Sequence, residues 1–154
     1  MSMKKHNRLD LAMNQFETAV ALFLAKKDYF SVITLAGAAD VVFCQMITRN
    51  GESNLTDILV DHDEKERSRE EVGREVNDLL FINDLKHLDP GNDEYISLNA
   101  YECAYTTILK GLANYNAFDS KNSKVVSDFL EWGQKNLDPD KYNIYCDPNW
   151  KPKA

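Results

Sequence analysis

Residues 31–40 read Ser-Val-Ile-Thr-Leu-Ala-Gly-Ala-Ala-Asp, and this stretch carries the strongest signal for the fold. Its serine can cap the start of a helix, and the apolar positions after it recur at helical spacing as far as Arg49. Asn50 and Gly51 then supply a typical helix end, because glycine readily adopts the left-handed conformation. The small side chains at residues 36–39 let a neighbour approach closely, so we expect the closest helix crossing there.

Helical signals also occur on both sides of that stretch. Apolar residues recur at helical spacing over residues 9–26 and predict a first helix. The sequence Ser68-Arg69-Glu70-Glu71 matches a capping box, in which a serine and a glutamate satisfy each other's exposed amides. We expect the helix that starts there to reach His87 and to end at Asp89-Pro90-Gly91, since proline cannot continue the hydrogen-bond ladder. Residues 52–67 are polar and predict no more than a short helical turn.

Two more helices are expected in the second half of the chain. Asn92 or Asp93 can cap a helix that continues to Tyr115, and apolar spacing predicts another over residues 123–136. Together these segments predict an all-α fold.

A single domain is the natural organisation for the whole chain, residues 1–154. A chain of this length buries a sizeable core without a metal or a disulfide. The predicted connections are mostly short, which favours an up-and-down bundle of four to five helices. The core should lie within about residues 9–137, and the proline-containing residues 138–154 should form an extended C-terminal tail.

Net charge and hydrophobicity limit the class of partner. The formal net charge is −7, so a long stretch of nucleic-acid phosphate is repelled unless basic residues cluster locally. The apolar run at residues 19–25 is shorter than the ~20 residues of a membrane span. Residues 1–8 are basic, but polar positions follow them in place of a signal-peptide core. We therefore expect a cytoplasmic protein, with a small local site for RNA or a nucleotide left open.

The sequence indicates no metal, cofactor or disulfide framework. Cys44, Cys103 and Cys146 stand singly, without the paired spacing of a zinc site. The acidic loop Asp61-His62-Asp63-Glu64 has no second cluster at ligand spacing, so we expect a flexible polar connection there.

Several segments resemble a group of uncharacterised bacterial proteins. Residues 21–24 and 29–40 look like the opening of proteins that read "SxITLAGAAEE". Asn83-Asp84-Leu85-Lys86-His87 resembles the "RNxxKH" motif of that group, and residues 104–118 resemble its last helix. Such proteins are similar to the HEPN superfamily. The resemblance implies a small helical bundle, a homodimer with facing motifs, and a metal-independent ribonuclease site where the motif has both its arginine and its histidine.

The resembled motif carries over to this chain except at its arginine. His87 matches the histidine, Lys86 and Asn83 match its neighbours, and Ile82 stands at the arginine position. RNA cleavage by an adjacent 2′-hydroxyl needs a group that moves a proton and a cation that stabilises the phosphorane. Lys86 or Arg74 is the alternative cation, although lysine lacks the planar fork and Arg74 is more than three helical turns away. The alternative role for His87 is that of a surface histidine near a helix end.

A second resemblance concerns acidic residues of the same predicted helix. Residues 75–81 resemble the second half of the acidic motif of MazG-type nucleotide pyrophosphohydrolases. Glu71, Glu75 and Asp78 would share a helical face that could hold Mg²⁺ against a triphosphate. The upstream pair of glutamates in that motif is absent from this chain, and the alternative is a solvated face of mixed charge.

Three functions therefore follow from the sequence. The first is a non-catalytic HEPN-like binding or regulatory module, present as a homodimer or with another protein partner. The second is a toxin-like ribonuclease that uses His87, and the third is a Mg²⁺-dependent nucleotide pyrophosphohydrolase.

Overall fold

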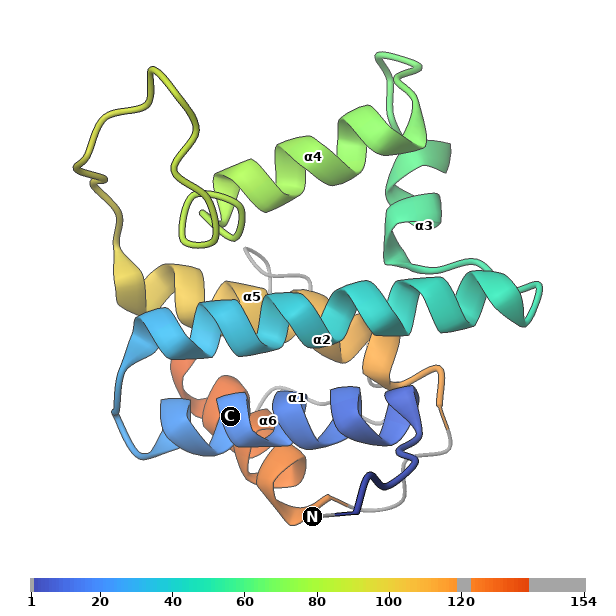
Figure 1. Ribbon diagram of the computed structural model, residues 1–154, viewed down its shortest axis with the longest axis vertical. Helices are drawn as coiled ribbons and strands as arrows, with labels where there is room; N and C mark the ends of the chain where they lie inside the picture. Colours follow the sequence, from blue (N-terminus) through green and yellow to red (C-terminus); the bar gives the residue numbers. More distant parts are fainter. Residues whose placement is uncertain (1, 119–122, 139–154) are drawn as a thin grey trace.

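The all-helical class predicted from the sequence is confirmed. The computed structural model describes residues 2–118 and 123–138, and within these ranges it contains six helices and no strand (Figure 1). The sequence predicts four to five helices, and the additional one is a complete short helix within residues 52–67. From residue 139 onward, the expected tail lies outside the described residues. The helices are α1 (Arg8–Leu24), α2 (Tyr29–Arg49), α3 (Leu55–Asp61), α4 (Arg69–Leu79), α5 (Ala100–Tyr115) and α6 (Lys124–Asn136).

Helices α1, α2 and α5 form the centre of the molecule, and α6 packs against α1 (Figure 1). Helices α1 and α2 are antiparallel, but α2 and α5 run in the same direction (Figure 1). In side-chain contacts, Asp40 lies opposite Lys110 and Cys44 lies opposite Asn114. The expected up-and-down order is therefore wrong for this pair. The reason is the long crossover of residues 50–99, which includes α3 and α4 and returns the chain to the end where α2 began (Figure 1).

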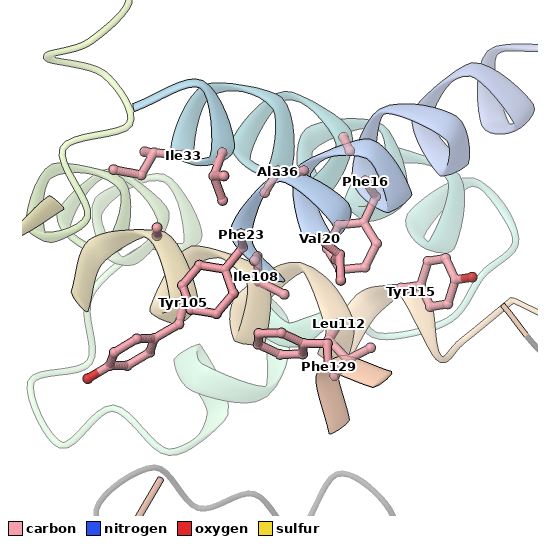
Figure 2. Close-up of a cluster of buried hydrophobic side chains, with 14 of the residues drawn as sticks. Phe16, Val20, Phe23, Ile33, Ala36, Tyr105, Ile108, Leu112, Tyr115 and Phe129 are labelled. Carbon is pink, nitrogen blue, oxygen red and sulfur yellow. The ribbon is translucent and has the colours of Figure 1, made fainter. Parts of the chain in front are cut away.

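The hydrophobic core lies between α1, α2, α5 and α6. Side chains from α1, α5 and α6 meet in its centre (Figure 2). The Phe16 ring stacks on Tyr115 with ring centroids 5.1 Å apart, and its edge contacts Phe43 at 5.7 Å. All three rings are at most 3% exposed, so the core fixes α1 against both α2 and α5.

Two glycines permit close approaches to helices. A Cβ built on Gly111 of α5 would lie 2.6 Å from Phe16 Cε2, and one built on Gly37 of α2 would lie 2.8 Å from Ile82 Cγ2. The small side chains at residues 36–39 predict a close crossing with another helix. At Gly37 that expectation is wrong, because its close neighbour Ile82 belongs to the irregular segment after α4.

The predicted capping box at Ser68 is confirmed as the start of α4. The Glu71 amide donates to Ser68 Oγ (3.3 Å), and the Ser68 amide donates to Glu71 Oε2 (2.8 Å). The start of α2 is three residues earlier than predicted. Its cap is Asp28, whose carboxylate accepts hydrogen bonds from the Ser31 amide and hydroxyl. Ser31 therefore lies in the first turn of the helix and donates to the cap residue.

Two predicted helix boundaries in the crossover are wrong. Helix α4 ends at Leu79, well before His87, because the chain turns into a left-handed residue after the helix. Helix α5 starts at Ala100 with Asn99 as its cap, whereas Asn92 or Asp93 was the predicted cap. The chain between these helices is an irregular arch (Figure 1).

In the described part of the chain, α2 alone has the length and apolar composition of a membrane-crossing helix. Eight of its residues are buried, and it packs against α1 and α5. The same composition is typical of a central core helix, which is the role of α2 here.

Candidate functional site

The segment after α4 positions the resembled motif. Phe81 adopts a left-handed backbone conformation with φ at +58°, and the Ile82 amide donates to the Asn77 carbonyl at 3.0 Å. The Phe81 amide donates to the Asp78 carbonyl at 3.1 Å, which completes a Schellman motif. This turn directs Ile82 inward, where its side chain is 2% exposed. The position of the motif arginine is therefore part of the core.

Three candidate site residues lie on the turns that follow. Asn83 is half-buried, and its Nδ2 donates to Asp78 Oδ1 at 3.2 Å. Its carbonyl accepts the amides of Lys86 and His87, both at 3.0 Å. The side chains of Lys86 and His87 are exposed and lie beyond the end of α4. The structure thus presents His87 to solvent on a turn, and the prediction that it lies on the helix is wrong.

The acidic residues of α4 line a shallow open groove. Glu71, Glu75 and Asp78 share this groove of about 470 Å³ with Arg74, Leu79 and Phe81. Each carboxylate also has a partner elsewhere. Glu71 belongs to the capping box, Glu75 pairs with Arg67, and Asp78 accepts from Asn83. Hydrogen bonds from Ser68 hold the pKa of Glu71 below its ordinary value.

The spacing of these carboxylates was the basis of the alternative in which they hold magnesium. Across residues 2–118 and 123–138, no group of three or more His, Cys, Asp and Glu side chains is arranged to hold a metal ion. Capping, ion pairing and helix termination account for the contacts that the three carboxylates make.

The loop before α4 is organised by an arginine. Arg67 Nε lies 3.0 Å from Asp63 Oδ2, its Nη2 lies 3.1 Å from Asp63 Oδ1, and its Nη1 pairs with Glu75. The Arg67 amide also donates to Asp63 at 2.9 Å. These hydrogen bonds lower the pKa of Asp63 to about 2. The loop expected to be a flexible polar connection therefore has a defined charged contact at its centre.

A buried polar cluster at the contact of α2 and α5 was missed by the sequence analysis. Asp40 is 1% exposed and pairs with Lys110 Nζ. Asn114 Nδ2 donates to Asp40 Oδ1 at 2.6 Å and lies 3.3 Å from Cys44 Sγ. Burial, followed by the charge of Asp40, raises the pKa of the Cys44 thiol to about 11. The cluster therefore consists of one buried ion pair with an amide and a neutral thiol beside it.

The buried cluster also anchors the crossover. Asn114 Oδ1 accepts the Leu55 amide at 2.8 Å, so one side chain joins α5 to the start of α3. Asn54, which caps α3, is 1% exposed and donates to Thr48 Oγ1 of α2 at 3.2 Å. The sequence does contain a signal for this buried cluster, because Asp40 and Lys110 each place a charge within an apolar helical stretch.

Comparison with known proteins adds no family to these observations: no protein-family model, curated protein sequence or solved structure matches the chain. The resemblance to HEPN-like proteins stays a prediction from the residues.

Proposed function

We propose that this protein is a non-catalytic binding or regulatory module of the HEPN-like kind. The observation that supports the proposal is the position of Ile82, which is 2% exposed and lies against Gly37. An arginine there would have to place its guanidinium in the core or distort the turn after α4. The cation that a HEPN-type ribonuclease needs is thus missing from the motif.

The other cations of this part of the chain are poor replacements for the motif arginine. Lys86 is exposed and carries a compact ammonium, which lacks the planar fork that arginine offers to a phosphorane. Arg74 lies within α4 and lines the groove that also contains Glu71, Glu75 and Asp78, before the turn that leads to His87. Arg67 is engaged by Asp63 and Glu75, and Arg69 is engaged by Asp57. A histidine without a positioned cation supplies proton transfer alone, which is a small part of the required acceleration.

Incubation of the full chain with single-stranded and stem-loop RNA, with and without Mg²⁺, tests this proposal. We expect no cleavage that distinguishes the wild type from a His87→Ala variant. His6→Ala serves as the matched control, because His6 is also exposed and lies outside the motif. Robust cleavage that is lost in His87→Ala and kept in His6→Ala would replace this proposal with the second function, the toxin-like ribonuclease. The exposure of His87 and Lys86 is the observation that favours that second function.

The third function has one supporting observation, the shared groove of Glu71, Glu75 and Asp78. A pyrophosphohydrolase would release pyrophosphate from nucleoside triphosphates in the presence of Mg²⁺, and Glu75→Gln would abolish the release. We expect no release from any of the four common ribonucleoside triphosphates.

We also propose that the module is a homodimer, as the resemblance implies. Exposed apolar side chains support an interface near the motif: Leu79 is 69% exposed and Leu88 is 70% exposed. Sedimentation of the wild type should give twice the 17.6 kDa mass of one chain, and a Leu79→Glu, Leu88→Glu variant should shift it toward one chain. A monomeric wild type at micromolar concentration would contradict the dimer.

A further inference from the structure

A basic groove lies on the side of the molecule to which three helix ends point. Arg8 is the first residue of α1, Arg49 is the last residue of α2, and Arg69 is the first residue of α4. The three arginines line one groove of about 390 Å³, and Figure 1 shows these helix ends on the same side of the molecule. The remaining lining consists of Val42, Gln45, Met46 and Thr48.

The charge of this groove is opposite to that of the chain. The sequence has 25 acidic and 18 basic residues, yet the groove is lined by three arginines and no carboxylate. Asp57 compensates Arg69 from outside the lining, so the charges of Arg8 and Arg49 are the ones that favour an anion locally, although the molecule as a whole is negative.

The three guanidinium groups differ in what they already bind. Arg69 Nε lies 3.2 Å from Asp57 Oδ1, and its Nη2 donates to Thr48 Oγ1 at 3.1 Å, so this side chain is held in place. Arg8 and Arg49 are exposed and form no ion pair with any residue in the described ranges. The groove thus has one oriented arginine and two with their donors available.

Helix stability does not explain Arg8, whereas the contacts with Asp57 and Thr48 give Arg69 a structural role. The amino-terminal end of a helix carries a partial positive charge, so a cation in the first turn opposes the helix dipole. Arg8 and Arg69 both occupy such a first position. Asp57 compensates the charge of Arg69, whereas Arg8 has no ion-pair partner in the described residues, so an anion in the groove would give Arg8 a favourable role that its helix does not supply.

We propose that this groove binds the phosphate group of a small phosphate monoester. A phosphate monoester carries close to two negative charges at neutral pH and offers three acceptor oxygens, which suits several arginine forks better than a monocarboxylate does. Val42 and Met46 are half-buried on the same face of α2 and provide an apolar surface for the organic part of the ligand. The groove lining contains no histidine, cysteine or carboxylate that could move a proton, so the groove suits binding without catalysis. The inference thus rests on the proposed binding function and names a ligand class for it.

Calorimetric titration of the full chain with phenyl phosphate tests the proposal. We expect a Kd of about 1 mM or lower at low salt. Arg8→Gln and Arg49→Gln should each weaken binding by about fivefold, since each loses charge-assisted hydrogen bonds in a solvent-exposed groove. Inorganic phosphate and benzoate should bind more weakly than phenyl phosphate, because the first lacks the apolar part and the second lacks one charge.

Arg74→Gln is the matched control, because Arg74 is an exposed arginine of α4 that lies outside this groove. It should leave the affinity unchanged, and thermal melting should show that all three variants are folded. The proposal is overturned if phenyl phosphate does not bind, if Arg74→Gln weakens binding as much as the groove variants do, or if an RNA oligonucleotide binds while phenyl phosphate does not. If phenyl phosphate does not bind and RNA is not cleaved, only the phosphate site is overturned and the non-catalytic function stands. If RNA is cleaved in a His87-dependent manner, the non-catalytic function is overturned, and the result of the phenyl phosphate titration is unaffected.

Discussion

Ile82 packs its branched side chain directly against the backbone of Gly37. A Cβ on that glycine would lie 2.8 Å from Ile82 Cγ2 and 3.3 Å from Ile82 Cδ1. The contact joins the central helix α2 to the turn after α4, and the left-handed Phe81 makes it possible by redirecting the chain. The same contact excludes an arginine from the position that the resembled ribonuclease motif assigns to it.

Gly37→Ala should destabilise the protein by about 1 kcal/mol, because overpacking against Ile82 exceeds the gain in helix propensity. In an Ile82→Ala background the same change should stabilise by about 0.5–1 kcal/mol, since the methyl then fills vacated space. Urea unfolding of the four proteins measures the coupling. Equal effects in both backgrounds would show that the two residues do not touch.

Gly73→Ala is the matched control for that cycle. Gly73 lies within α4, and a Cβ there would be 3.6 Å from Thr56 Cγ2, which is an ordinary contact. The substitution should therefore stabilise the protein by most of the ~1 kcal/mol difference in helix propensity.

Placing the arginine of the resembled motif at residue 82 should fail to create a ribonuclease. Ile82→Arg buries a cation against Gly37 without a partner, and we expect a loss of about 3 kcal/mol or more in the free energy of unfolding. Calorimetric melting and the RNA assay measure the two effects. A stable Ile82→Arg protein that cleaves RNA in a His87-dependent manner would contradict the structural argument.

Local sequence signals predicted those parts of the fold whose partners are close in sequence. The capping box needs only Ser68 and Glu71, three residues apart, and both hydrogen bonds are present. The predicted end of α2 is present too, with Gly51 at a φ of +78°. In contrast, the end of α4 depends on Phe81, a residue type that disfavours the left-handed conformation, so sequence patterns gave no warning of it.

Long-range contacts were outside the reach of sequence patterns. The parallel arrangement of α2 and α5 brings Asp40 to Lys110, and the two residues are seventy positions apart. Helical periodicity identifies a buried face but not its neighbour, so short loops suggested an up-and-down order that the crossover replaces. The basic groove likewise combines Arg8, Arg49 and Arg69 from three separate helices.

The buried ion pair should be far more sensitive to substitution than the exposed pairs. Lys110→Met leaves Asp40 uncompensated at 1% exposure, so we expect a loss of about 3 kcal/mol in urea unfolding. A double Asp40→Leu, Lys110→Met variant should recover much of that loss, because no charge is then buried.

An exposed pair supplies the control for this comparison. Lys124 and Asp128 are 87% and 44% exposed, so Lys124→Met should have no measurable effect on stability. If Lys110→Met were as well tolerated as Lys124→Met, the buried pair would not be the contact that holds α2 and α5 in register.

Asp63 gives the protein a specific response to acid. Hydrogen bonds from Arg67 lower the pKa of Asp63 from its ordinary value of 3.8 to about 2, because they favour the charged carboxylate. A group with a lowered pKa in the folded state contributes stability above its unfolded pKa, and this contribution is lost as the pH falls from about 4 through about 2.

A carboxyl ¹³C titration of the folded protein should therefore give Asp63 a midpoint near 2. Arg67→Gln should raise that midpoint toward the ordinary value, whereas Arg74→Gln should leave it unchanged, since Arg74 does not contribute to the shift. A wild-type midpoint near 4 would mean that Arg67 does not hold the loop before α4 in solution.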